Sequence, residues 1–233
     1  MRLPALLLAG LLLAGCGGEG PIFRVEDQLY DWVTVPGAID PASDRDPDII
    51  GEGVSFRLSP GQRRSALRTG EDWRLGQARL LGFDIRADRA ALGSGQVDIS
   101  RLVRAGDPGS PIVSAQLDAR NGVTVMGRNC IAAEDLSEWH RVEMRIRLSN
   151  ADNGFLEVFC DRKPVWARTK LRTTVAQDCA ETGGCVTRGT TPMGFEWQLG
   201  LMRDRSLSSP VSIQMKRLHH RLLIYVPNRA GNL

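Results

Sequence analysis

The chain has little net charge and no long apolar run. Its 233 residues carry 30 Lys and Arg against 27 Asp and Glu, a formal net charge of +3. This near balance argues against a nucleic-acid-binding protein held by bulk electrostatics, because such binding needs many excess cations. The longest apolar stretch, Leu3–Gly15, is shorter than the roughly 20 residues that a membrane-spanning helix requires. We therefore expect no nucleic-acid partner, and no spanning helix from this stretch.

Motifs for cofactors, metals and common nucleophiles are also missing. Gly95, Gly106 and Gly109 lack the helix and the lysine of a phosphate-binding loop. No Gly-x-Ser-x-Gly sequence marks a nucleophilic serine. The cysteines and the three histidines have none of the spacings of a zinc site. We therefore expect no cofactor and no bound metal.

The N-terminus has the pattern of an export signal. Arg2 is the only charged residue before Glu19, and Leu3–Gly15 is Leu, Ala and Gly apart from one proline, as in a secretory signal. The segment ends in Leu13-Ala14-Gly15-Cys16, which resembles the bacterial lipobox. The resemblance implies that residues 1–15 are removed and that Cys16 is lipidated. The two glycines that follow, with no Asp after the cysteine, resemble lipoproteins sorted to an outer membrane. We therefore expect an exported chain held at the cell envelope by acyl chains.

Four further cysteines follow Cys16. An exported chain with an even number of cysteines is expected to form disulfides, here with three possible connectivities. Only Ala-Glu-Thr-Gly-Gly separates Cys179 from Cys185, and this short segment closes easily into a loop. We therefore favour the pairs Cys179–Cys185 and Cys130–Cys160.

Strand-like alternation dominates the chain from residue 51 onward. Apolar residues recur at every second position in 81–85, 142–148, 156–160 and 211–215, which is typical of half-buried strands. Asn121-Gly122 and Asn153-Gly154 separate such segments, and Asn-Gly favours a hairpin because both residues tolerate positive φ. Pairing 141–149 with 155–161 would turn Cys160 toward the core. The sequence predicts an all-β sandwich, jelly roll or barrel at 51–226, after a lipidated tether and N-terminal segment at 16–50 and before a tail at 227–233.

Several segments in this region occur in an order known from one group of proteins. They are Arg64-Ser65-Ala66-Leu67-Arg68, Trp73–Gly76 with Leu80–Arg86, Ser110-Pro111, Glu138–Val142 with Asn153–Asp161, and Phe195–Arg203. Together they resemble the heparin-lyase-like and alginate-lyase-like polysaccharide lyases, which are concanavalin A-like jelly rolls. The resemblance implies two stacked antiparallel sheets, of which the concave one forms a sugar-binding groove.

The positions that carry the lyase reaction are substituted. Elimination next to a uronate carboxylate needs a group that neutralises the carboxylate, a base, and an acid for the leaving oxygen. The lyases use arginine on an early strand, Gln-x-His on a middle strand and tyrosine on a late strand. Arg64 and Arg68 are kept, but Ala66 replaces the glutamate between them, which is expected to leave one arginine without its usual partner.

The middle and late strands lack the expected histidine and tyrosines. Either Gln96-Val97-Asp98 or Ser100-Arg101-Leu102 occupies the Gln-x-His position, and neither contains histidine. Glu196, Gln198 and Met202 stand at the Tyr, Lys and Tyr positions of the late strand. The two tyrosines of the chain, Tyr30 and Tyr225, lie outside the motif.

We interpret the chain as a lipoprotein whose jelly roll binds an acidic polysaccharide without family-type catalysis. The candidate binding residues are Arg64, Arg68, Asp98, Arg101, Glu196 and Gln198, and no catalytic residue is assigned. Two alternatives stay open: a divergent lyase with Glu196 or Asp98 as its base, and a structural lipoprotein that binds a protein.

Three other features are expected to be structural. Trp139 is predicted to lie in the core, with His140 beside it at the start of a strand. His219 and His220 are predicted to lie on opposite faces of a strand, with one of them exposed.

Overall fold

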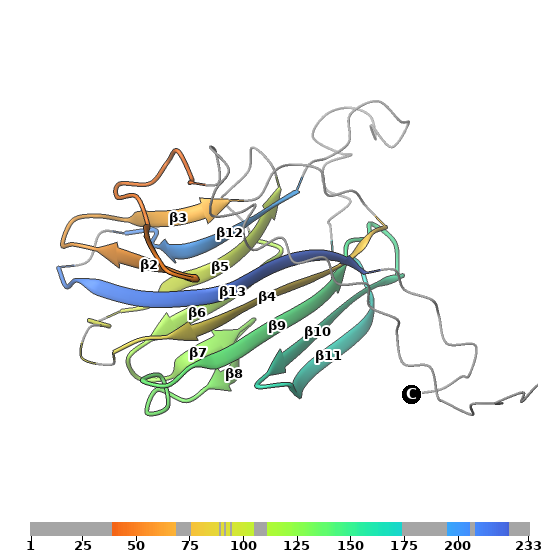
Figure 1. Ribbon diagram of the computed structural model, residues 1–233. Coiled ribbons are helices and arrows are strands. Elements are labelled where there is room, and N and C mark those ends of the chain that lie inside the picture. Colours follow the sequence, from red (N-terminus) through yellow and green to blue (C-terminus); the bar gives the residue numbers. More distant parts are fainter. Residues whose placement is uncertain are drawn as a thin grey trace, which may run out of the picture.

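The computed structural model describes residues 39–68, 76–88, 90, 92–93, 95–104, 111–173, 195–205 and 208–223. These residues form thirteen β-strands and no α-helix (Figure 1). The strands are β1 (Asp48–Ile50), β2 (Gly53–Leu58), β3 (Arg64–Arg68), β4 (Ala78–Arg86), β5 (Val97–Arg104), β6 (Val113–Asp118), β7 (Gly122–Val125), β8 (Arg128–Ile131), β9 (His140–Arg147), β10 (Gly154–Cys160), β11 (Lys163–Leu171), β12 (Phe195–Met202) and β13 (Val211–Leu223).

The strands form two antiparallel sheets stacked face to face (Figure 1). A seven-stranded sheet has the order β1-β2-β13-β4-β9-β10-β11, and a six-stranded sheet has the order β3-β12-β5-β6-β7-β8. Strands that are adjacent in a sheet are often far apart in the sequence, as β3 and β12 are. The chain therefore passes repeatedly from one sheet to the other. This arrangement confirms the predicted all-β jelly roll of two stacked sheets.

The core lies between the sheets because apolar and polar residues alternate along the strands. Val142, Met144 and Ile146 of β9 are at most 1% exposed, whereas the charged residues between them are partly exposed. From the opposite sheet the fully buried Trp197 packs into the same core. Its indole nitrogen donates a 2.7 Å hydrogen bond to Ser100 Oγ, so the polar atom of the ring is satisfied. Period two thus decides which side of each strand is buried.

Both predicted hairpins are present, but their glycines are needed for different reasons. Gly122 begins β7 with φ of 77°, which an L-residue rarely adopts. Gly154 begins β10 without a positive φ; a Cβ there would approach the Leu171 carbonyl oxygen to less than 3.0 Å. The expectation of positive φ therefore holds at Gly122, whereas close backbone approach explains Gly154.

A disulfide joins the two sheets. Cys130 on β8 and Cys160 on β10 are bonded, with 5.5 Å between their Cα atoms. Cys160 is 5% exposed and belongs to the core, as the alternation of β10 predicts. The predicted pair Cys130–Cys160 is therefore confirmed, whereas Cys16 and the predicted pair Cys179–Cys185 lie outside the described residues.

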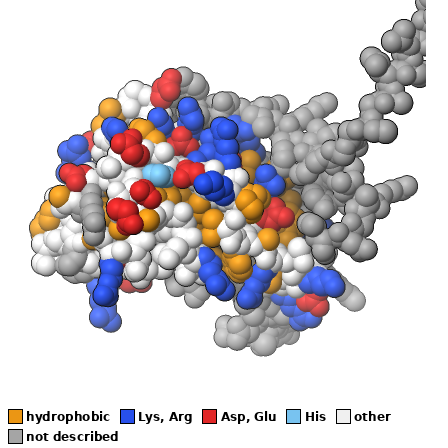
Figure 2. Space-filling model, turned by 90° about the horizontal axis from the view of Figure 1, so that it is seen from below, with side chains coloured by type: hydrophobic (Ala, Val, Ile, Leu, Met, Phe, Trp, Pro, Cys, Tyr) orange, Lys and Arg blue, Asp and Glu red, His pale blue; other side chains and the backbone are white. Residues whose placement is uncertain are grey.

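The described surface mixes charges of both signs. Acidic and basic side chains are interspersed with apolar ones across the face shown in Figure 2. Nowhere in the described ranges does the chain form an apolar helix of membrane-spanning length. The same ranges hold no group of three His, Cys, Asp or Glu side chains placed to bind a metal ion.

Candidate functional site

The six candidate binding residues come together on the outer side of three adjacent strands, β3, β12 and β5. Gln198 on β12 is paired with Arg68 on one side and with Arg101 on the other. Met202, four residues further along β12, is paired with Arg64 and with Asp98 in the same way. Directly opposed residues in a sheet share a face. The intervening residues Trp197, Leu199, Leu67 and Leu102 belong to the core. We call the opposite surface, with Arg64, Arg68, Asp98, Arg101, Glu196 and Gln198, the six-stranded face.

A β-bulge places two of these residues together on β5. Asp98 and Arg101 are three positions apart, so a regular strand would turn them to opposite faces. The pairing with β6 and β12 is irregular between Asp98 and Ser100, which brings both side chains to the same side. Arg101 Nε donates a hydrogen bond to Asp98 Oδ2. The two alignments that the sequence left open therefore each contribute one residue to the six-stranded face.

Every arginine on the six-stranded face has a carboxylate partner. Arg64 Nε donates a 2.6 Å hydrogen bond to Asp40 Oδ2, and Asp40 is 4% exposed. This carboxylate comes from the segment before β1, whose backbone also bonds to β3. Arg68 Nη1 lies 3.7 Å from Glu196 Oε2. Ala66 thus removes the usual glutamate partner, and the carboxylates of Asp40 and Glu196 pair with Arg64 and Arg68 in its place.

The third arginine is held on two sides. Besides Asp98, the Arg101 guanidinium contacts Asp204, with 3.0 Å between Nη2 and Oδ1. The Asp204 side chain is 88% exposed, whereas that of Arg101 is 10% exposed. Arg101 is thereby fixed in orientation, with one carboxylate partner that solvent or a ligand can reach.

Gln198 lies at the centre of the face with one buried polar atom unsatisfied. Its Nε2 donates a 2.6 Å hydrogen bond to Glu196 Oε1. Its Oε1 is buried and accepts no hydrogen bond from any described residue. A buried acceptor without a donor costs about 1–3 kcal/mol. The geometry therefore favours a water or a ligand hydroxyl between the flanking arginines.

Solvent reaches this network at Arg68 and Asp204. The Arg68 side chain is 39% exposed, while Asp98, Arg101, Glu196 and Gln198 are all at most 8% exposed. The Arg68–Glu196 ion pair is long, at 3.7 Å, and only its Arg68 side is open to solvent. Arg68 is thus the cation of the face that can most easily exchange its partner for another anion.

The described residues of the three strands β3, β5 and β12 include no histidine and no tyrosine. Glu196 and Met202 occupy the positions at which the resemblance expects tyrosines. A methionine thioether cannot donate a proton. The buried carboxylate of Glu196 is the proton acceptor closest to Arg68.

Comparison with known proteins finds similarity in structure only. No family model matches the chain. No curated protein matches it either. Among solved structures, the chain is similar to an endo-β-1,4-glucuronan lyase from the fungus Trichoderma reesei, with a TM-score of 0.53 and 14% identity over 72% of this chain and 79% of that one. It is also similar to an alginate lyase of polysaccharide lyase family 7, with a TM-score of 0.52 and 10% identity over 77% of this chain and 83% of that one. The fold is that of the jelly-roll polysaccharide lyases.

His140 has a structural place in this lyase-like fold. Its Nδ1 lies 2.8 Å from Asp161 Oδ2 and its Nε2 lies 2.8 Å from the Asp135 carbonyl oxygen, so both ring nitrogens are engaged. Burial alone would lower the pKa of His140, but these bonds outweigh it and raise the pKa. The ring fastens the start of β9 to two turns, in agreement with the structural role expected for it.

His219 and His220 point to opposite sides of β13, but neither is exposed. His220, 7% exposed, meets the Trp197 ring edge-on with 6.1 Å between centroids. His219, 4% exposed, lies on the outer side, with 3.7 Å between its Nε2 and Glu143 Oε1. The prediction of opposite faces is right and the prediction of one exposed ring is wrong. Gly82 explains the burial, because a Cβ there would approach the His219 ring to less than 3.0 Å.

His219 belongs to a charged cluster that the sequence reasoning missed. The nearby His219 ring and the Arg141 guanidinium together lower the pKa of Glu143 to about 2. Asp84 lies beside it, ion-paired to Arg141 at 3.7 Å and to Arg217 at 3.4 Å. The sequence did contain a sign of this cluster: β4 and β9 both carry charged residues at positions that face the same side of the sheet when the two strands pair.

The position of Trp139 also differs from the prediction. It is half-buried on the outer side of the seven-stranded sheet, between the Arg86 guanidinium at 4.8 Å and the Lys216 ammonium at 4.2 Å from its ring centroid. The prediction that Trp139 lies in the core is therefore wrong. Its ring is covered by charged side chains from β4 and β13 instead of by apolar ones.

Proposed function

We propose that the protein is an envelope-anchored lipoprotein that binds an acidic polysaccharide on the six-stranded face and does not cleave it. One observation carries this proposal: Arg68, Gln198 and Arg101 form a continuous row across β3, β12 and β5. A guanidinium presents a planar fork that matches a carboxylate. Gln198, between the two arginines, holds the Glu196 carboxylate through its Nε2 and so keeps that carboxylate beside Arg68.

The acidic nature of the ligand follows from Arg68. This side chain is accessible, and its contact with Glu196 is long enough to be exchanged. A uronate carboxylate would take the place of Glu196 at the guanidinium, while Arg64 stays bound to Asp40. The names of the two similar structures give glucuronan and alginate as substrates, which supports the same ligand class here.

Binding without cleavage follows from the substituted positions. Elimination requires a base and a proton donor on either side of the scissile bond. Met202 replaces one hydroxyl, and Glu196 replaces the other while already bound to Gln198. A groove that keeps its cations but has lost its proton donor can hold the polymer without the reaction.

The binding test uses isothermal titration calorimetry with alginate and glucuronan, and a neutral glucan as the control ligand. Arg68→Gln is expected to weaken binding about tenfold or more, because a charge-assisted hydrogen bond contributes about 1.5–3 kcal/mol. The matched control is Arg172→Gln, which removes an exposed arginine paired with Asp152 on the other sheet and should leave affinity unchanged. No heat of binding with either acidic polymer would refute the proposal.

A second candidate is a divergent lyase, favoured by the buried carboxylate of Glu196 beside Arg68. In this reaction Glu196 would take the proton on the carbon next to the uronate carboxylate, and the glycosidic C–O bond at the following carbon would break. The leaving oxygen would take a proton from water, and the product would carry a C=C bond conjugated with the carboxylate. Ultraviolet absorbance that grows on incubation with alginate or glucuronan, and that is lost in Glu196→Gln, would establish this candidate in place of the first.

The anchor is tested separately from the ligand. Cys16 lies outside the described residues, so its role rests on the lipobox resemblance. We expect the protein in the outer-membrane fraction of a bacterial host and Cys16→Ala in the soluble fraction. A structural lipoprotein that binds a protein partner would show the same fractionation but no affinity for acidic polymers.

A further inference from the structure

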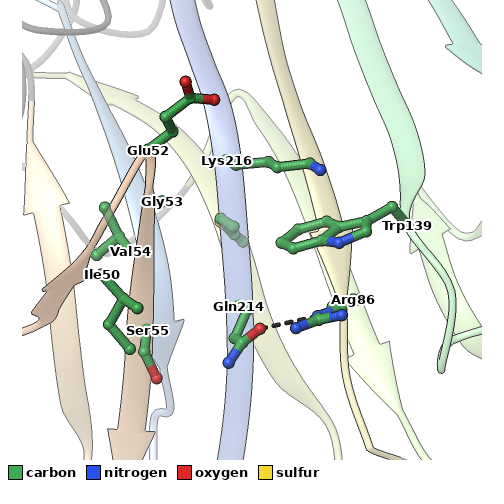
Figure 3. Close-up of a pocket in the computed structure, with 10 residues that line it drawn as sticks. Ile50, Glu52, Gly53, Val54, Ser55, Arg86, Trp139, Gln214 and Lys216 are labelled. Atoms are coloured by element: carbon green, nitrogen blue, oxygen red, sulfur yellow. Dashed lines mark hydrogen bonds between the residues drawn. The ribbon is translucent and has the colours of Figure 1, made fainter.

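A second pocket lies on the outer side of the seven-stranded sheet, away from the six-stranded face. Its volume is about 210 Å³. The β1–β2 hairpin forms one wall, Trp139 forms the other, and β13 forms the floor (Figure 3). The lining residues are Ile50, Glu52, Gly53, Val54, Ser55, Arg86, Trp139, Gln214, Met215 and Lys216. Small-molecule sites usually occupy about 300–1,000 Å³, so this pocket suits one sugar-sized group.

Two cations are held in place beside the pocket by Trp139. The indole ring lies between the Lys216 ammonium and the Arg86 guanidinium, with its edge toward the pocket (Figure 3). Arg86 Nε also donates a 2.8 Å hydrogen bond to Gln214 Oε1. Cation–π contacts on both faces of one ring fix the two charges without neutralising them.

Neither cation is paired with a carboxylate. Among the described residues, no Asp or Glu oxygen lies within 4.0 Å of a side-chain nitrogen of Arg86 or Lys216. Asp84, the neighbour of Lys216 across the sheet, is engaged by Arg141 and Arg217. This differs from the six-stranded face, where every arginine has a partner. The pocket therefore carries two positive charges on preorganised side chains, although the Asp84 carboxylate attracts Lys216 from a longer distance and Glu52 also lines the pocket.

Backbone irregularity in β13 helps to position one of these cations. The pairing of β13 with β4 shifts between Lys216 and His219, and Arg217 has a φ of 50°. A bulge of this kind changes the direction of the side chains beside it. Here it places Arg217 at Asp84, which leaves Lys216 to lie over Trp139.

The remaining walls offer what a sugar ring needs. Ser55 and Gln214 provide polar atoms, and the exposed Ile50 provides an apolar surface opposite the indole edge (Figure 3). The one acidic lining residue, Glu52, lies at the Lys216 end of the pocket, away from Arg86 and Gln214 in the same view. Carboxylate recognition by Arg86, a second cation that can bind a hydroxyl group, and contact of C–H groups with an apolar wall are thus available together.

We infer that this pocket binds a single uronate residue, with its carboxylate at Arg86 and a hydroxyl group at Lys216, because the two cations lie on opposite faces of the indole ring. The site shares no residue with the six-stranded face, so it does not depend on the proposed function. Bound to the same polymer, the two sites would hold it on opposite sides of the fold.

The test follows the indole N–H signals of the purified chain in two-dimensional ¹⁵N–¹H NMR spectra, with the Trp139 signal identified from Trp139→Phe. Sodium glucuronate is expected to shift this signal saturably, and glucose to leave it unchanged. Lys216→Met and Arg86→Gln should each weaken binding tenfold or more. Lys163→Met, which removes an exposed lysine on β11, is the matched control and should have no effect.

Two results would overturn the inference. Absence of a saturable shift of the Trp139 signal would show that no uronate binds. An equal response to sodium sulfate would show that the pocket takes any small anion and has no sugar specificity. Arg68→Gln separates the sites: it should leave the Trp139 response to glucuronate intact, whatever its effect on polysaccharide binding.

Discussion

The disulfide between the two sheets permits a quantitative test of what holds the sandwich together. We propose to replace both partners, in Cys130→Ala/Cys160→Ala, because a single replacement leaves a reactive thiol. The bond closes a loop over a sequence separation of 30 residues. Loop-closure entropy for a loop of this length is worth about 3–4 kcal/mol at 25 °C. Since domains are stable by only about 5–15 kcal/mol, this loss should be large and easily measured.

Urea unfolding followed by tryptophan fluorescence measures the change. The double variant is expected to lose about 3–4 kcal/mol of unfolding free energy relative to the oxidised protein. The reduced wild-type protein is the control, because it keeps both sulfur atoms in the core but loses the crosslink. A loss below about 1 kcal/mol would refute the loop-closure argument. A reduced protein as stable as the oxidised one would assign the effect of the double variant to packing at Cys160.

Three further predictions concern buried polar groups. Gly82→Ala should destabilise the fold by about 1–3 kcal/mol, because the new methyl group meets the His219 ring; thermal unfolding measures this, and an unchanged midpoint would contradict it. The pKa of Glu143 is lowered from 4.5 to about 2, so the ionised carboxylate stabilises the fold above its unfolded pKa, and this stabilisation is lost as the pH falls toward 2. In denaturant unfolding at several pH values, Glu143→Gln should therefore lose less stability at acid pH than the wild-type protein does. The same pH dependence in both proteins would count against this prediction. Trp197→Phe should cost about 1–3 kcal/mol in urea unfolding by leaving the Ser100 hydroxyl without its donor, and the added change Ser100→Ala should recover part of the loss.

Much of the fold could be predicted because strand alternation is a local property. The apolar positions of 142–148 and 156–160 indicate which side of β9 and β10 is buried, and Asn153-Gly154 indicates that the strands pair. The same periodicity correctly turns Cys160 to the core and Glu196 with Gln198 away from it. The lyase-like order of segments then predicts the stacking of the two sheets.

The details of the candidate site depend on features that no local pattern reveals. The bulge in β5 that brings Asp98 beside Arg101 is set by pairing with strands far away in the sequence. Asp40 reaches Arg64 from an irregular segment 24 residues earlier. Trp139 is of a residue type that is usually buried, and only the positions of Arg86 and Lys216 in the structure show that its ring contacts two cations. Periodicity predicts which residues of a strand point away from the core, but long-range contacts determine how those residues interact with one another.

The segment that carries Asp40 has a mechanical consequence. It lies along β3, the edge of the six-stranded sheet, where the Asp40 and Asp44 amides bond to the carbonyl oxygens of Ala66 and Arg64. Tension applied to the chain before residue 39 would load these few bonds one after another, as in unzipping, and leave the sheets intact. The first contacts to break would include the Asp40–Arg64 pair, which frees a guanidinium on the six-stranded face. Tension on this segment would thereby add a cation to the surface that we propose holds the polymer.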